Sequence, residues 1–497
     1  MTILLLAYFK FRSEEHSLSE LAKAIPPQES DPSQAIQTLQ GGRSSKAPNV
    51  RQAVFQAVWR WHFYAGIIFA PFLIVLAISG SAYLFKPQIE DYLYRDFLTV
   101  SQTGQHPMSP AEVIAKTEKG YPGAKVSSIT LMKAPTDTYR LSVSHFGTPT
   151  TMYADPYTGN IKGALNADKT FSAIFKKLHS QLLIEGTWTN RLVELAACWA
   201  LILVLTGLIL WWPRGKKNIW GTVLPRLSKP GSRMFWRDLH AVPAFWISLV
   251  LVVMILSGLP WSGVLGPRIS ELADSTRTNV PPYAYSFGAK PESTTVAKDI
   301  AEDLPWAAEN LSVPASSASG GYVALTVNDV AGIADKLDVL KPYTITLPRG
   351  ETGVFTVSTS HDKPDTSATL HIDQYSGAVL TDVRFADYGI MGKLISYGIA
   401  FHEGHLFGLA NQLLGLFAAL GLVLVSISSY FMWRKRKPDG LGAPNRSKNR
   451  KVSVAVLVLM VVCGVVMPLV GLSLIVVVLL DWFVIRRIKT LRHWFSA

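Results

Sequence analysis

The hydrophobic positions of this chain fall into long blocks, and polar segments with a different pattern separate the blocks. The first four blocks occupy residues 61–85, 192–212, 240–262 and 406–433. A helix needs about 20 apolar residues to cross the hydrocarbon core of a bilayer. Each block therefore predicts one membrane-spanning helix.

A fifth apolar block, residues 452–485, is too long for a single span. Pro468 and Gly471 lie near its middle, and both residue types disfavour a continuous helix. We expect a tight hairpin of two short helices, with Asp481 near the membrane interface, where a carboxylate costs less than at the bilayer centre.

Two polar stretches, residues 86–178 and 263–399, show a different periodicity. Short segments such as KVSSITLM and GVFTVSTS alternate apolar and polar residues, and turn signals such as DPYTGN follow them. Each stretch is expected to fold as a mixed α+β domain outside the membrane.

Charge indicates which side of the membrane these domains occupy. The chain of 497 residues has 48 Lys and Arg against 35 Asp and Glu, a formal net charge of +13, and its mean hydropathy of +0.23 is too high for a disordered chain or an ordinary soluble enzyme. The cations concentrate in three short segments, 213–237, 434–451 and 486–497. The positive-inside rule places these segments in the cytoplasm and both polar domains on the opposite side. Because topology explains the positive charge, nucleic acid is not expected as a partner.

These patterns predict the following organisation. The segments are a cytoplasmic tail (1–52), a first span (53–85), a first outer domain (86–178), an interfacial segment with the second span (179–212), a cytoplasmic basic loop (213–237), a third span (238–262), a second outer domain (263–399), an interfacial segment with the fourth span (400–433), a second cytoplasmic basic loop (434–451), the C-terminal hairpin (452–485) and a cytoplasmic tail (486–497).

The two cysteines restrict the possible redox chemistry. Cys198 and Cys463 both lie in apolar blocks, and the chain has no C-x-x-C or C-x-x-C-H motif. Structural zinc, iron–sulfur clusters, covalent c-type haem and a disulfide framework are therefore disfavoured. Nucleotide binding also lacks a motif, since no Walker loop or G-x-G-x-x-G occurs.

An internal duplication is the most specific signal in the sequence. His62 precedes a Ser-Gly pair at Ser79 by 17 residues, and His240 precedes a second Ser-Gly pair at Ser257 by the same 17 residues. Each half continues with a polar domain that ends in a similar turn, YADPYTG or IDQYSG. The halves thus share one plan of span, outer domain and returning span.

The duplication brings histidines into two pairs. His62 and His240 lie at the cytoplasmic ends of their spans, and His179 and His402 precede the two returning spans. Two histidine pairs at opposite faces of a four-helix bundle predict two bis-imidazole haems b, one near each face. A single interfacial histidine can instead extend its ring towards the headgroups, but a repeated pair favours ligation.

The ligand at the outer side stays open between two residues. His402 and His405 are close together, and His405 is the nearer to the fourth span. His179 lies too far from Trp212 for one helix across the membrane, so we expect a break near residues 185–190 and a short interfacial helix that carries His179.

Four further residues are candidates for binding haem propionates, namely Arg60, Arg237, Asn190 and Arg191. Positive-inside anchoring at the membrane surface also accounts for Arg60 and Arg237.

Several blocks together resemble the PepSY-associated transmembrane family. They are WRWH…LAISG, YADPYTGNIKG with KLHSQLL, LTGLILWWPR, FWRDLH…ILSG, IDQYSGAVL and FHEGHLFG…MWRKR, and they cover about residues 55–435. The resemblance implies a mainly α-helical, multi-pass protein of the bacterial inner membrane, with a duplicated four-helix haem-binding bundle, two periplasmic α+β PepSY-like domains and a C-terminal helical hairpin. It further implies a ferric-siderophore reductase with two haems b, ligated by His62 and His240 on the inner side and by His179 with His402 or His405 on the outer side. Ala241 and Val242 depart from the family pattern after His240.

Three functions can be considered for a sequence with these features. The first is an oxidoreductase that passes electrons from a cytoplasmic donor or quinol to a periplasmic ferric siderophore and so releases ferrous iron. The second is a membrane-anchored PepSY regulator or inhibitor of periplasmic peptidases, without redox activity. A transporter is disfavoured, because the spans lack paired intramembrane acids.

Overall fold

A computed structural model describes most of the chain after residue 49. The described residues are 50–101, 103–104, 106–213, 219–280, 295–301, 304–316, 323–359, 361–436, 440–444 and 449–495. The predicted tail up to residue 49 and parts of both predicted basic loops lie outside them. The chain divides into two compact units, residues 1–53 and residues 54–497.

Five helices among the described residues are long and apolar enough to cross a membrane. They include α3 (Val50–Leu84), α8 (Thr187–Trp211), α9 (Arg233–Gly258), α14 (Leu409–Arg436) and the segment Pro468–Ile485, which begins with α16 (Pro468–Leu480). Large apolar side chains on these helices, such as Leu249 and Leu420, are exposed, as expected for surfaces that contact lipid. Pro71 in α3 and Pro243 in α9 lie inside their helices, a placement that membrane helices tolerate.

The C-terminal apolar block forms two helices that meet at Met467. These are α15 (Arg450–Val466) and α16, and Pro468 occupies the first turn of α16, where its missing N–H costs nothing. Gly464 and Gly471 allow the two backbones to approach closely, because a β-carbon on Gly464 would lie 2.8 Å from Cα of Gly471. The hairpin packs on α8, where the indole Nε1 of Trp199 donates to Ser473 Oγ at 3.1 Å. A short helix, α17 (Lys489–Phe495), follows.

The two polar stretches build one sheet rather than two separate ones. Its eight antiparallel strands lie in the order β4-β3-β2-β1-β5-β6-β7-β8. The strands are β1 (Ala124–Leu131), β2 (Tyr139–His145), β3 (Thr148–Ala154), β4 (Ile161–Asn166), β5 (Tyr343–Thr346), β6 (Val354–Thr359), β7 (Ala368–Asp373) and β8 (Val379–Arg384). The halves join where β1 pairs with β5, with Ser128 opposite Thr346 and Leu131 opposite Tyr343. The two predicted domains therefore share a single core.

Two equivalent helices cover one face of this sheet. They are α6 (Pro110–Gly120) and α12 (Val327–Lys336), and each begins with a capping box, formed by Ser109 with Glu112 and by Thr326 with Asp329. Apolar side chains of α6, α12 and the inward-facing strand positions form one core. Alternate positions of β1, β2 and β5 carry Ser, Thr and Arg on the opposite face, and some of them, such as Thr130, Arg140 and Thr344, line the cavity described below.

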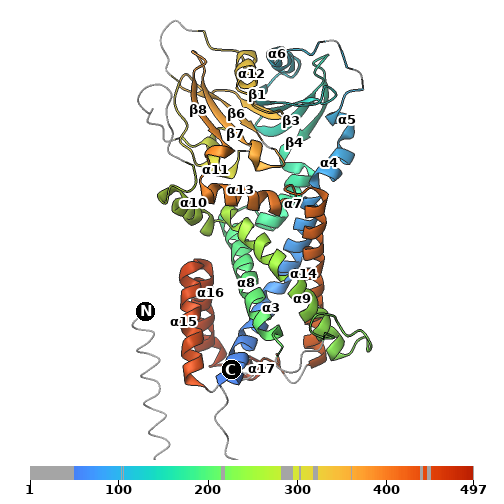
Figure 1. The fold of residues 1–497 in the computed structure, drawn as a ribbon, viewed down its shortest axis with the longest axis vertical. Coiled ribbons are helices and arrows are strands. Elements are labelled where there is room, and N and C mark those ends of the chain that lie inside the picture. The colour runs from blue at the N-terminus through green and yellow to red at the C-terminus, as the bar shows by residue number, and fades with distance from the viewer. Residues whose placement is uncertain are drawn as a thin grey trace, which may run out of the picture. The chain divides into compact units, whose positions relative to one another are not determined.

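Short helices connect the sheet with the long helices, and Figure 1 shows most of them between the two layers, with α5 beside the edge of the sheet. They are α4 (Lys86–Leu93), α5 (Arg95–Leu98), α7 (Phe171–Gln181), α10 (Leu265–Ser275), α11 (Trp306–Glu309) and α13 (Ile390–His402). α7 packs against α8, and α13 packs against α9. The end of the long helices near the sheet is called the sheet end below. The opposite end, which carries Arg233 and Arg434, is called the basic end.

Candidate functional site

The first histidine pair lies near the basic end and joins α3 to α9. The ring centroids of His62 and His240 are 6.2 Å apart, and their planes are inclined by 82°. Nδ1 of His62 lies 2.9 Å from Thr206 Oγ1 on α8, and Nδ1 of His240 lies 2.9 Å from the carbonyl oxygen of Val425 on α14. The pair is therefore anchored to all four long helices that surround it.

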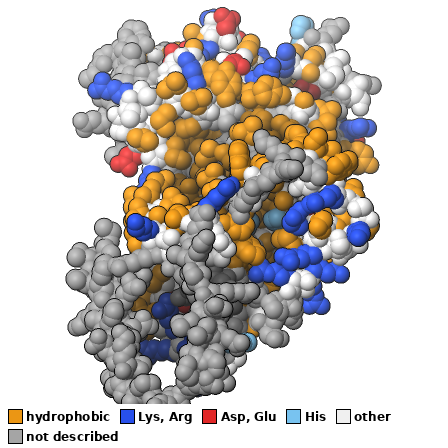
Figure 2. All heavy atoms as spheres, turned by 60° about the horizontal axis from the view of Figure 1, so that its bottom comes forward, with side chains coloured by type: hydrophobic (Ala, Val, Ile, Leu, Met, Phe, Trp, Pro, Cys, Tyr) orange, Lys and Arg blue, Asp and Glu red, His pale blue; other side chains and the backbone are white. Residues whose placement is uncertain are grey.

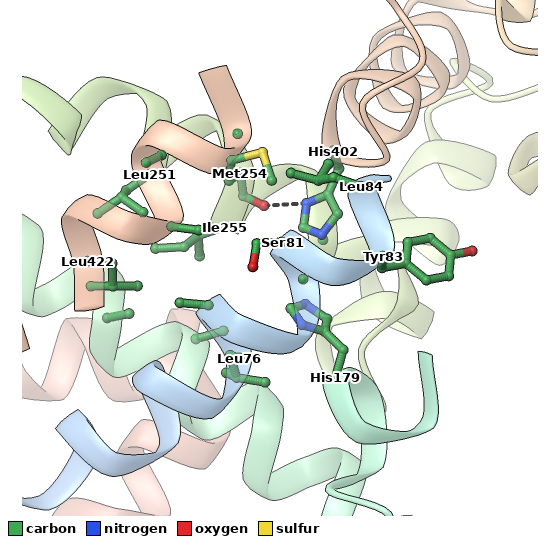
Figure 3. A pocket seen from close by; sticks show the side chains of 18 of the residues that line it. Leu76, Ser81, Tyr83, Leu84, His179, Leu251, Met254, Ile255, His402 and Leu422 are labelled. Carbon is green, nitrogen blue, oxygen red and sulfur yellow. Dashed lines mark hydrogen bonds between the residues drawn. The ribbon is translucent and has the colours of Figure 1, made fainter. Parts of the chain in front are cut away.

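The second pair lies at the sheet end and repeats this arrangement. The centroids of His179 on α7 and His402 on α13 are also 6.2 Å apart, with an interplanar angle of 69°. Nδ1 of His179 lies 3.1 Å from Ser79 Oγ, whereas Nδ1 of His402 donates to Met254 O at 2.8 Å and lies 3.2 Å from Ser257 Oγ. Figure 3 shows the two rings turned towards each other across α3.

In all four rings, Nδ1 is the nitrogen that is held by the protein. Within the described part of the chain, Nε2 of these four rings makes no hydrogen bond. When Nδ1 donates its proton to an oxygen, Nε2 keeps its lone pair. Each pair thus presents two ring nitrogens that can act as metal ligands.

The two Ser-Gly motifs of the sequence contact the second histidine pair. The Cε1 atom of His179 would lie 3.0 Å from a β-carbon on Gly80, and Cε1 of His402 would lie 3.0 Å from a β-carbon on Gly258. In the sequence these motifs mark the repeat, and their contacts with the histidines are not among the predictions above. The equal spacing of 17 residues from His62 and His240 shows that the two Ser-Gly pairs are equivalent, but it does not indicate which histidines they contact.

The pKa values of the second pair favour neutral imidazoles. Burial, together with the neighbouring His402, lowers the pKa of His179 to about 4, and burial also lowers the pKa of His402. Both rings are therefore uncharged near neutral pH, the form in which a histidine donates its lone pair to a metal.

One continuous cavity of about 2360 Å³ is lined by all four histidines. Ordinary ligand pockets measure about 300–1,000 Å³, so this cavity has room for more than one large ligand. Between the pairs, its wall is mainly apolar and includes Leu73, Leu76, Leu203, Leu251 and Ile255. Because Ser79 follows His62 by 17 residues along α3, the two pairs are separated by about 25 Å of helix rise.

His405 does not share the position of His402. Its Nδ1 lies 3.4 Å from Asp362 Oδ1, and its Nε2 lies 3.9 Å from Glu403 Oε2. Gly404, with a φ of +80°, turns the chain between the end of α13 and His405. Of the two candidates, His402 is the one that the structure places opposite His179.

The four predicted propionate partners are placed differently from one another. Arg237 and Asn190 line the cavity. Arg60 instead donates to Pro444 O at 2.7 Å and lies over the ring of Tyr64, and neither it nor Arg191 is among the lining residues.

The geometry of the pairs does not suit a bare metal ion. Within the described residues, no group of three or more His, Cys, Asp and Glu side chains could hold one. Two opposed imidazoles instead suit a metal that already has equatorial ligands of its own, as in a porphyrin.

The fold and this site define a class, namely a multi-pass membrane protein in which paired histidines line a cavity below a separate eight-stranded sheet. The model of the family described as PepSY-associated TM region matches residues 59–436, so this chain belongs to that family. No curated protein matched the chain significantly.

Proposed function

We propose that this protein is an inner-membrane dihaem oxidoreductase that reduces ferric siderophore on the sheet side of the membrane and so releases ferrous iron. The observation that carries the proposal is the occurrence of two opposed histidine pairs, both with centroids 6.2 Å apart, that line one cavity.

The residues present fit a haem b at each pair. The 6.2 Å between the ring centroids of each pair would leave room for one metal ion between the two imidazoles, at ordinary metal–nitrogen distances of about 2.0 Å. The apolar wall can solvate a macrocycle, and the oxygens that bind Nδ1 fix the ring orientation, as partners of metal-bound histidines commonly do. His62 with His240 would hold one haem and His179 with His402 the other, and bound haem would supply one-electron transfer.

The proposed orientation rests on the distribution of charge. Arg233, Arg434 and Arg486 lie at the ends of membrane-spanning segments that point away from the sheet, and the positive-inside rule assigns such ends to the cytoplasm. The sheet is then periplasmic in a bacterial cell. Electrons would enter at the basic end, from a cytoplasmic donor or quinol, and leave at the sheet end.

The sheet end of the cavity supports access by a substrate. Past the second histidine pair, the cavity continues to polar residues of the sheet, including Thr130, Arg140 and Thr344. Tyr94 and Tyr153 also line this part. These groups can donate hydrogen bonds to a ferric chelate beside the second pair, where it would accept an electron.

Absorption spectra of the detergent-purified protein test the proposal directly. We expect sharp reduced α-bands and two haems b per chain in a pyridine haemochrome assay. His62→Ala and His240→Ala should each remove one haem and stop electron flow across proteoliposomes to a ferric chelate, whereas His106→Ala should retain both haems, because His106 is exposed outside the cavity.

The same haem measurement distinguishes the proposed function from the alternative one. Folded protein from haem-replete cells that contains no haem would refute the electron-transfer proposal. A membrane-anchored PepSY regulator of periplasmic peptidases would then be the better hypothesis.

A further inference from the structure

The acidic residues that line the cavity are confined to one of its ends, whereas cations line both ends. Its acidic residues belong to the sheet end, and they are Glu90, Asp91, Glu194, Glu309, Asp362 and Glu403. At the basic end, the charged lining residues are Arg233, Arg237 and Arg436. The chamber around His62 and His240 is therefore bordered by cations, and Figure 2 shows Lys and Arg side chains gathered beside apolar surface in a view towards this end.

One carboxylate compensates only part of this charge. Asp238 is fully buried, and its two oxygens pair with Arg226 Nε and Arg237 Nη2, both at 2.7 Å. In the described part of the chain, Arg233 and Arg436 have no carboxylate partner. They nevertheless lie close enough for the charge of Arg233 to act on Arg436. Both cations therefore line the cavity at its basic end.

Their placement relates them to the first histidine pair. Arg233 precedes His240 by seven residues on α9, so both side chains lie on one face of the helix, about 10 Å apart along its axis. The guanidinium of Arg436 lies over the ring of Trp59 at 4.6 Å, and Trp59 precedes His62 by three residues on α3. Arg233 thus reaches this chamber from α9, the helix of His240, and Arg436 reaches it from α14 by contacting Trp59 on α3, the helix of His62.

We propose that Arg233 and Arg436 bind the two propionate carboxylates of the haem held by His62 and His240. The inference rests on the proposed function and names the anion that this cation pair takes. Carboxylates at one edge of a porphyrin would neutralise both guanidiniums, and such charge-assisted hydrogen bonds are among the stronger ones. Arg237, already paired with Asp238, supports the site, and Arg60 lies outside it.

Comparing haem with its dimethyl ester tests this assignment, because the ester lacks the carboxylate charges. Protein made in haem-deficient cells is titrated with either compound, in a His402→Ala background that leaves only the first site. We expect protohaem to bind about tenfold or more tightly than the ester, as for the loss of a charged hydrogen bond. Arg233→Gln with Arg436→Gln should bring this ratio close to one.

Arg434→Gln is the matched control, since it removes the same charge from the last turn of α14 at an exposed position outside the cavity. It should keep the wild-type preference. In otherwise wild-type protein, each Arg→Gln change in the pair should also lower the midpoint potential of one haem, because a nearby cation favours the reduced state. Arg233→Lys and Arg436→Lys, which keep the charge, should largely preserve that potential.

The outcomes distinguish the two proposals. If the Gln variants bind haem with the wild-type preference for protohaem over its ester and with the wild-type midpoint potential, the propionate assignment is overturned. The proposed function would still stand. The assignment would also be overturned if the Gln variants changed only the amount of anionic lipid that co-purifies with the protein. The arginines would then bind lipid phosphate groups and not haem carboxylates. Absence of haem from the wild-type protein would overturn the proposed function and this inference together.

Discussion

The imidazole of His179 rests edge-on against Gly80, with Cε1 3.0 Å from the place a β-carbon would occupy. His402 has the same relationship to Gly258 at the same distance. Both glycines follow a serine whose hydroxyl lies within hydrogen-bonding distance of the histidine. The duplication therefore repeats the Ser-Gly pair that contacts the imidazole as well as the histidine itself.

The close contact between glycine and histidine predicts the effect of one methyl group added at Gly80 or Gly258. In Gly80→Ala or Gly258→Ala, the β-carbon would contact the ring at a distance closer than ordinary van der Waals contact, so the histidine must move. We expect each variant to fall from two haems per chain towards one, measured by pyridine haemochrome. Gly332→Ala on α12 is the control, because its β-carbon would meet open space. Full haem content with an unchanged spectrum in both variants would contradict the prediction.

The two candidate ligands at the sheet end should respond differently to alanine. His402→Ala removes the ring that faces His179 and should eliminate one haem. His405→Ala removes a ring that faces Asp362 and should leave both haems in place. Reduced-minus-oxidised spectra of the two variants check this, and loss of haem from His405→Ala alone would reverse the assignment.

The buried carboxylate of Asp238 should be important for stability. In Asp238→Asn, Arg226 and Arg237 lose their shared counter-charge, and we expect destabilisation of about 2 kcal/mol, below the usual 3–5 for buried pairs because both arginines are partly exposed. Thermal unfolding in detergent measures the change. Asp382→Asn, which breaks the more exposed pair with Arg384, should cost less than about 1 kcal/mol. Equal effects of the two substitutions would count against this account.

The sheet should lose stability in acid through His371. This side chain is fully buried on β7 and its Nδ1 lies 3.0 Å from Thr356 Oγ1, and burial lowers its pKa to about 4. Since the unfolded chain binds this proton near pH 6.5 and the folded chain only near pH 4, stability falls as the pH drops between these values, by up to about 3 kcal/mol.

Acid titration followed by near-ultraviolet circular dichroism tests this dependence. In His371→Asn, unfolding should depend less steeply on pH between about 6.5 and 4, whereas His106→Asn, at an exposed position, should follow the wild type. A wild-type slope in His371→Asn would show that another group is responsible.

Local patterns in the sequence were enough for the membrane class and for part of the site. Spans, polar stretches and the break before Pro468 are visible because runs of apolar residues, strand alternation and proline act on nearby backbone. The repeated distance from His62 to Ser79 and from His240 to Ser257 also predicted that histidines would meet in pairs, since repeats of one plan place equivalent residues opposite each other.

Other features depend on contacts between distant segments, and only the tertiary structure decided them. The union of the two polar stretches in one sheet results from pairing of β1 with β5, more than 200 residues later, which the pattern within each strand does not specify. His402 and His405 are chemically alike, and the turn at Gly404 determines which of them faces His179. Likewise, Arg60 lies on Pro444 while Arg233 and Arg436 border the cavity, because the rotation of each helix about its axis is set by packing against its neighbours.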